Sequence, residues 1–97
     1  MQIFGNGSLP NQVKGFVVLR TEKDKRSAWL KWAPSDDAYA YNIHVGVAPD
    51  KLYSCIMVHG AAEYYFKGMD KDLPYYFSIE ALNENGVSAR TPVVEVK

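Results

Sequence analysis

The chain has 97 residues, and its 11 basic and 11 acidic side chains give a formal net charge of zero at pH 7. A chain of this length forms a single domain that buries roughly 65% of its unfolded surface, and its mixed charges argue against nucleic acid as a partner. One cysteine excludes an internal disulfide, and no apolar stretch reaches the roughly 18 residues that membrane insertion requires.

The first half of the chain alternates apolar and polar residues with a period of two, which is typical of β-strands. "VKGFVVLR" at 13–20 and "SAWLKW" at 27–32 predict two strands, and Ala28, Leu30 and Trp32 share one face of the second. "YAYNIHVGV" at 39–47 predicts a third strand. Its core face would carry Tyr39, Tyr41, Ile43 and Val45, and its other face Asn42 and His44.

The second half continues the pattern. "LYSCIMV" at 52–58 predicts a strand in which both parities are partly apolar, so either face fits the core. "EYYFKGM" at 63–69 and "LPYYFSIEAL" at 73–82 predict two more strands, and "NENG" a tight hairpin. "RTPVVEVK" closes the chain as an edge strand containing Pro92. About seven short strands in such a chain predict an all-β fold, a seven-stranded two-sheet immunoglobulin-like sandwich.

Residues 10–97 resemble a fibronectin type III domain, and residues 1–9 then read as a linker or the tail of a preceding domain. The resemblance rests on Trp32 at the end of the second strand, on Tyr41-Asn42-Ile43 in the third, and on an ordered series near the end of the chain. That series is Met69, Tyr75, Phe77, Ile79, Ala81, Asn83 and Gly86.

This resemblance implies a structural core made of Trp32, Leu30, Tyr41, Ile43, Phe66, Met69, Tyr75, Phe77, Ile79 and Ala81. Tyr75 would be the tyrosine corner, with its ring buried and its hydroxyl bonded to backbone. The sequence departs from the family pattern where Met69 replaces the usual leucine and "DKDLP" replaces a Pro-Gly turn. It has no Arg-Gly-Asp sequence, so the integrin-binding role of some family members has no residues to carry it.

The chain also resembles the C-terminal accessory module of bacterial glycoside hydrolase family 43 enzymes, of the xylosidase/arabinosidase type. The segments that carry this resemblance are "VVLRTEKDKRSAWLKW", "PDKLY" and "YYFSIEALNENG". This resemblance implies a secreted, periplasmic or cell-surface setting. It also implies a non-catalytic spacer or brace whose partners are the neighbouring domains of its parent chain, and a plant-type polysaccharide as a further candidate partner. As an isolated domain it is expected to be monomeric.

No catalytic residue, cofactor or metal site is predicted. The predicted strands place four acidic residues in turns, with no cleft between them: Asp36, Asp37, Asp70 and Asp72. Paired catalytic carboxylates of glycosidases act across a cleft that holds the sugar. His44 is expected to be an exposed cross-strand neighbour of Glu80 and not a ligand. Cys55 is expected to be a buried or half-buried apolar residue.

The aromatic content, 7 Tyr, 4 Phe and 2 Trp, exceeds what one small core needs. If Trp32 faces the core, alternation places Trp29 on the solvent face, and Tyr65 reaches the same face when Tyr64 and Phe66 are buried. Trp29 and Tyr65 are therefore candidates for a stabilising cross-strand pair, a docking surface or a sugar-stacking platform. Tyr76 lies on the outer face of the other sheet, as an exposed residue or a ligand contact. Accessory module, carbohydrate-binding module and protein-interaction module remain the alternatives.

Overall fold

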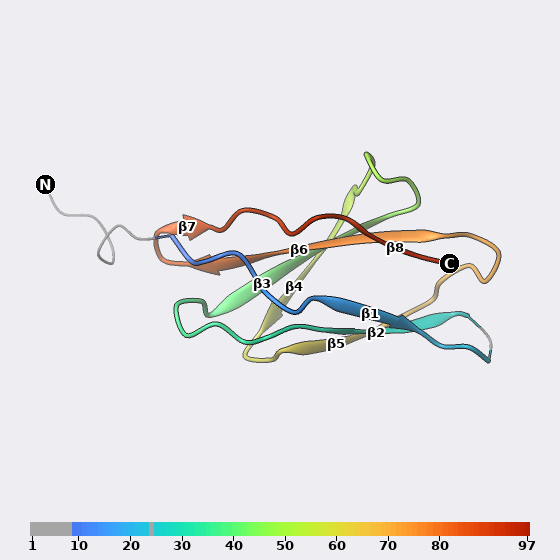
Figure 1. Ribbon diagram of the computed structural model, residues 1–97, viewed down its shortest axis with the longest axis horizontal. Helices are drawn as coiled ribbons and strands as arrows, with labels where there is room; N and C mark the ends of the chain where they lie inside the picture. The colour runs from blue at the N-terminus through green and yellow to red at the C-terminus, as the bar shows by residue number, and fades with distance from the viewer. Residues whose placement is uncertain (1–8, 24) are drawn as a thin grey trace, which may run out of the picture.

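The computed structural model of the chain describes residues 9–23 and 25–97, so the predicted linker lies outside these ranges apart from Leu9. Two antiparallel sheets pack face to face, and the described residues contain no helix (Figure 1). The strands are β1 (Val17–Arg20), β2 (Ser27–Lys31), β3 (Ala40–Gly46), β4 (Ser54–His59), β5 (Glu63–Lys67), β6 (Tyr75–Asn83), β7 (Gly86–Val87) and β8 (Val94–Val96). One sheet has the order β1-β2-β5. The other has the order β4-β3-β6, and β6 pairs further with both β7 and β8.

The core lies between the two sheets, because alternate residues of each strand are apolar and point inward. Leu30 of β2, Ile43 of β3 and Phe77 of β6 are fully buried. Each such side chain stabilises the fold by about 1.5–3 kcal/mol relative to its exposed state. Of the residues assigned to the core from the sequence, Phe66 and Tyr75 are half-buried and pack against it. The others are buried: Leu30, Trp32, Tyr41, Ile43, Met69, Phe77, Ile79 and Ala81. The predicted two-sheet sandwich is confirmed.

The described residues form eight strands where the sequence predicts seven, because β7 was not predicted as a strand: it begins at Gly86 of the predicted hairpin and pairs with the end of β6. Of the last predicted strand, residues 90–97, only β8 is a strand, and residues 88–93 separate β7 from β8. The segment between them still follows β6, since the amide of Ser88 donates to Ala81 and the amide of Thr91 donates to Ile79. In return, the Ser88 and Thr91 hydroxyls accept from the amides of Ala81 and Ile79, at 2.9 and 3.1 Å. Side-chain oxygens therefore complete the ladder where Pro92 and its neighbours interrupt the strand.

The predicted hairpin at 83–86 is confirmed, with Asn83 paired to Gly86 and two residues in the loop. The Asn83 side chain accepts from the amide of Asn85 at 2.8 Å, which closes an Asx turn. Gly86 has a φ of 139°, which favours glycine, and a Cβ there would lie 2.9 Å from the Leu9 side chain. The first described residue therefore packs against this hairpin.

Two predictions about side-chain facing are wrong. Tyr39 is 58% exposed and not on the core face, because β3 begins at Ala40 and the alternation does not extend back to position 39. Cys55 is exposed and not buried, because β4 is the edge of its sheet and its outer side is uncovered. The facing of β4, open in the sequence, follows from the register: Ile56 and Val58 point toward the core, and Cys55 and Met57 point outward.

Tyr75 and Arg20 together fix the loop before β6. The Tyr75 hydroxyl accepts a hydrogen bond from the backbone amide of Asp70 at 2.6 Å, which is the geometry that the resemblance implies for a tyrosine corner. The Arg20 guanidinium lies 5.3 Å from the centre of the Tyr75 ring. It also donates to the carbonyls of Asp70 and Leu73, both at 2.8 Å. The Arg20 guanidinium and the Tyr75 hydroxyl thus hold this loop against the sandwich.

The chain enters and leaves the sandwich at opposite ends (Figure 1). Leu9 packs against Gly86, which pairs with the last residue of β6. Val96 of β8 pairs with Tyr75, the first residue of β6. A strand of 9 residues such as β6 rises roughly 27–30 Å, so the two ends are separated by about that distance.

Candidate functional site

Trp29 and Tyr65 form an aromatic pair on the outer side of the three-stranded sheet. They are directly opposite in the register of β2 and β5, and their ring centroids lie 4.6 Å apart at an interplanar angle of 45°. Trp29 is 41% exposed and Tyr65 is half-buried. The structure therefore brings together the two residues that alternation placed on this face, in a contact of the kind that adds about 0.2–1 kcal/mol to a sheet.

Strand β1 extends this pair into a larger apolar surface. Leu19 is directly opposite Trp29 and is 56% exposed, while Val17 lies two residues away on the same side of the strand and is 47% exposed. We call the surface formed by Val17, Leu19, Trp29 and Tyr65 the aromatic face. Sequence reasoning missed Val17 and Leu19. The signal was available, since Val18 and Leu30 pair inward and their neighbours on β1 must then point outward.

Two ammonium groups border the aromatic face. The Lys31 nitrogen lies 5.9 Å from the centre of the Trp29 ring, and the Lys67 nitrogen lies 5.9 Å from the centre of the Tyr65 ring. Glu63 stands directly opposite Lys31 in the register. These are the charged side chains of β2 and β5 that share this side of the sheet, so the face offers apolar area with a thin charged border.

Tyr76 takes the opposite parity to Tyr75, as predicted, but its hydroxyl is already engaged. It donates to a carboxylate oxygen of Glu95 on β8 at 3.0 Å, and the ring is half-buried. This hydrogen bond, with smaller contributions from burial and from the charge of Glu95, raises the pKa of Tyr76 above its ordinary value. The contact ties β8 to β6, so a structural role accounts for the hydroxyl.

A buried polar cluster lies on the outer side of the other sheet, where the sequence predicted an exposed histidine. His44 is only 8% exposed, and its Nε2 donates to Glu80 at 3.0 Å, because an ionised carboxylate can only accept. Asn42 donates to the same carboxylate oxygen at 3.0 Å, and Arg90 lies 3.7 Å from the other one. The prediction of an exposed His44 is therefore wrong, since its partner and its neighbours cover it.

The same contacts set the ionisation of Glu80. Burial favours the neutral acid, but the hydrogen bonds from Asn42 and His44 and the nearby charges of His44 and Arg90 outweigh it. The pKa of Glu80 is therefore lowered from its ordinary value of 4.5. A carboxylate held ionised by two hydrogen bonds and a nearby guanidinium stabilises the sheet and is poorly suited to move protons at neutral pH.

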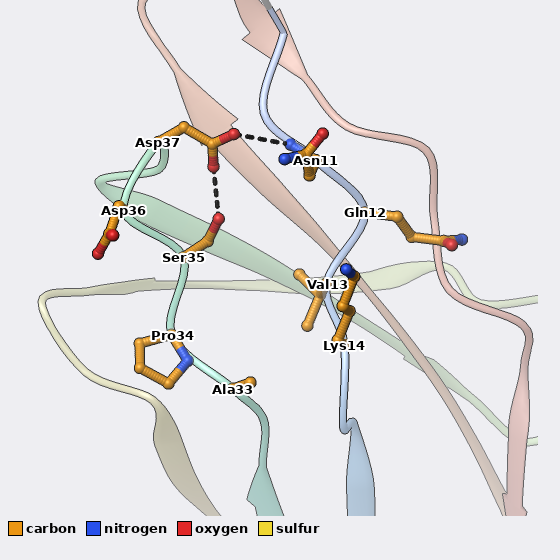
Figure 2. A pocket seen from close by; sticks show the side chains of 9 residues that line it. All are labelled: Asn11, Gln12, Val13, Lys14, Ala33, Pro34, Ser35, Asp36 and Asp37. Carbon is orange, nitrogen blue, oxygen red and sulfur yellow. Dashed lines mark hydrogen bonds between the residues drawn. The ribbon is translucent and has the colours of Figure 1, made fainter.

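The hollow at one end of the sandwich is lined by residues 11–14 and 33–37 and has a volume of about 360 Å³ (Figure 2). Asp37 points into it, and both of its carboxylate oxygens are engaged. One accepts from the amide of Asn11 at 3.1 Å, and the other accepts from the Ser35 hydroxyl. These bonds, that from Ser35 first, lower the pKa of Asp37. The carboxylate therefore joins the first described segment to the β2–β3 loop, which gives it a structural role.

The two acidic pairs considered from the sequence, Asp36 with Asp37 and Asp70 with Asp72, lie at opposite ends of the sandwich. The carbonyl of Asp37 accepts from Asn83 at the far end of β6, whereas the amide of Asp70 bonds to Tyr75 at its start. Two such groups at opposite ends of a strand cannot flank one glycosidic bond. Within residues 9–23 and 25–97, no group of three or more potential metal ligands converges. No helix in the described part is long and apolar enough to cross a membrane.

No protein-family model matches the chain. A search of curated proteins gives no match either. Among solved structures, FN3tt superimposes with a TM-score of 0.80 at 25% identity, covering 92% of this chain and 94% of that one. An Fn3-like protein from Clostridium thermocellum gives 0.75 at 16% identity, covering 96% and 94%. The sixth fibronectin type III domain of human fibronectin type III domain containing protein 3 gives 0.72 at 22%, covering 95% and 88%.

The chain therefore has the fibronectin type III fold, over nearly its whole length. Domains with this fold are generally non-catalytic modules. The similarity to solved structures shows the fold and does not identify a ligand, so a more specific role has to be argued from the surfaces described above.

Proposed function

We propose that this domain is a non-catalytic accessory module of a secreted bacterial glycoside hydrolase of the xylosidase/arabinosidase type, in which it spaces and braces the catalytic unit. The observation that carries the spacing role is the path of the chain, which enters beside Gly86 and leaves beside Tyr75. A module threaded in this way separates its neighbours by roughly the length of β6, about 27–30 Å. The assignment to such an enzyme rests on the sequence resemblance.

A spacer has to resist deformation along its length, and the fold supports this. β6 pairs on both sides: Tyr76 to Leu82 pair with β3, and the other side of the strand pairs with β7, the 88–91 segment and β8. The loop at the exit end is fixed by Tyr75 and Arg20. A rod of this kind holds two neighbours at a set distance, whereas a Gly/Ser-rich linker of equal length would sample many distances.

The bracing role is assigned to the aromatic face. Apolar side chains that stay exposed in one contiguous area are typical of surfaces that contact another protein domain. Leu19 and Trp29 each expose a large fraction of their side chains and lie opposite each other, so a neighbour that covered them would gain hydrophobic stabilisation. We assign that neighbour to the same parent chain, because a tether keeps its effective concentration high.

A carbohydrate-binding module is the second candidate, and the Trp29–Tyr65 pair is the observation that favours it. Aromatic rings on a flat sheet could stack against sugar rings. However, the two rings are tilted by 45° and contact each other, and the polar groups beside them are limited to Lys31, Lys67 and Glu63. Few convergent hydrogen-bonding groups are then available to orient a sugar.

Two experiments separate these roles. Deleting residues 10–97 from the parent enzyme should lower the temperature at which its catalytic domain unfolds, and an unchanged temperature would contradict bracing. In parallel, the isolated domain is passed over insoluble xylan and arabinan. The spacer role predicts no retention, whereas retention that Trp29→Ala abolishes would favour the carbohydrate-binding module. Leu73→Ala, an exposed apolar residue at a different place, is the matched control.

A further inference from the structure

Strand β4 is an open edge without the features that usually protect one. It ends the order of the five-stranded sheet and pairs with β3 on one side only, so its other side presents unpaired backbone groups. Residues 52–58 contain no Asp, Glu, Lys, Arg or Pro. Met57 is 53% exposed, and Cys55 is exposed beside it. An uncharged edge of this kind is suited to pairing with another strand.

The other edges in the described part of the chain are protected. The Arg20 guanidinium of β1 reaches the carbonyl of Val96 on β8, 3.5 Å away, so this edge is flanked by the opposite sheet. Strand β5 is bounded by the charged Glu63 and Lys67. Strand β7 consists of only 2 residues, and strand β8 follows Pro92 and consists of only 3. The contrast within one domain singles out β4 as the exposed pairing edge.

We propose that the β4 edge pairs antiparallel with the β4 edge of a second copy of this chain, about a two-fold axis. Directly opposite residues of an antiparallel pair share a face, so the joined sheet must keep Ile56 and Val58 on the core side in both copies. Centring the axis on Cys55, Ile56 or Met57 meets this condition. With the axis at Ile56, Cys55 lies opposite Met57 of the other copy. With the axis at Cys55, that residue lies opposite itself and Met57 lies opposite Tyr53. With the axis at Met57, that residue lies opposite itself and Cys55 lies opposite His59, at the end of the strand.

A second copy suits this edge better than a charged partner would. An isologous contact needs only one self-complementary surface, and residues 52–58 bring no like charges together. The chain has a formal net charge of zero, so two copies approach without long-range repulsion. One strand pair forms a small interface, and we expect a weak dimer. The expectation of a monomer from the sequence would then hold only in dilute solution.

Sedimentation velocity over about 10 μM to about 1 mM tests the proposal, in the range where small interfaces associate. The mass should rise from 10.9 kDa toward twice that value. The double variant Cys55→Lys with Met57→Lys places lysines directly opposite each other in each register, and should weaken dimerisation by about tenfold or more. Leu73→Lys with Val87→Lys is the matched control, because it adds the same charge to exposed apolar residues away from both β4 and the aromatic face, and should leave dimerisation unchanged.

Hydrogen exchange on the unsubstituted chain keeps the test independent of whether the variants fold. The amides of β4 should become more protected as concentration rises, while those of β5 should not change. A mass that stays at one chain throughout the concentration range would overturn the proposal. So would a dimer whose added protection falls on β1 and β2, since that result would place the contact on the aromatic face.

Discussion

Tyr75, the first residue of β6, allows a test of the fold in which a single hydroxyl group is removed. Tyr75→Phe keeps the ring that packs near Phe66 and under Arg20, and removes only the hydroxyl that accepts from the amide of Asp70. A single intramolecular hydrogen bond contributes about 0.5–1.5 kcal/mol. Since Asp70 is exposed, its freed amide can bind water, so we expect a loss of about 1 kcal/mol in the free energy of unfolding.

Urea and thermal unfolding of the isolated domain measure this loss. A change of about 1 kcal/mol should lower the melting temperature by about 4–8 °C in a domain of this size, and the urea midpoint by roughly 0.3–1 M. Tyr53→Phe is the matched control, because it also removes one tyrosine hydroxyl, but from a side chain that is 84% exposed to solvent. Its midpoint should move much less. Equal shifts for the two variants, or no shift for Tyr75→Phe, would refute the assignment of Tyr75 as the anchor of the loop.

Three further substitutions test the packing and the polar cluster. Leu30→Ala leaves a cavity at a fully buried position and should cost about 2–5 kcal/mol in urea unfolding. Gly46→Ala sets a Cβ 2.1 Å from the backbone carbonyl oxygen of Lys51, so the backbone has to shift. It should cost more than Gly60→Ala, whose Cβ meets no neighbour and whose cost of about 1–2 kcal/mol comes from the left-handed backbone at φ 65°. The lowered pKa of Glu80 means that its stabilisation is present above pH 4.5 and is lost as the pH falls. Glu80→Gln should therefore be less stable at pH 7, and its urea midpoint should fall less steeply than that of the parent domain between pH 5 and pH 3.

The alternation of apolar residues predicted the two-sheet sandwich, and the resemblance to fibronectin type III domains added the list of core residues. Ile43 sits in a period-two pattern whose other parity is polar, so its facing follows from the pattern itself. The other parity of the Trp32 strand contains Trp29, so the inward facing of Trp32 rests also on the family resemblance. The aromatic pair followed in the same way, because fixing Trp32 inward leaves Trp29 outward. The local pattern was enough to predict which way these side chains face, because the contacts that they make lie on their own strand or on a neighbouring one.

Features that depend on covering segments could not be predicted. His44 alternates outward, and only the pairing of β3 with β6 and the approach of Arg90 bury it against Glu80. Cys55 lies in an apolar stretch of the sequence, yet its side chain is exposed, because β4 is the edge strand of its sheet and no further strand lies beyond it. Burial on the outer face of a sheet is set by elements distant in sequence, and period-two patterning carries no information about them.

Thermal unfolding of the full-length parent enzyme, compared with its Trp29→Ala variant, tests the proposed bracing role most directly. The isolated domain carrying the same substitution is measured alongside, which gives the part of the effect that comes from the Trp29–Tyr65 pair within the domain, about 0.2–1 kcal/mol. If the aromatic face docks on the catalytic unit, the variant should lower the unfolding temperature of the catalytic domain itself. A catalytic domain that unfolds at the same temperature in both proteins would contradict the proposal.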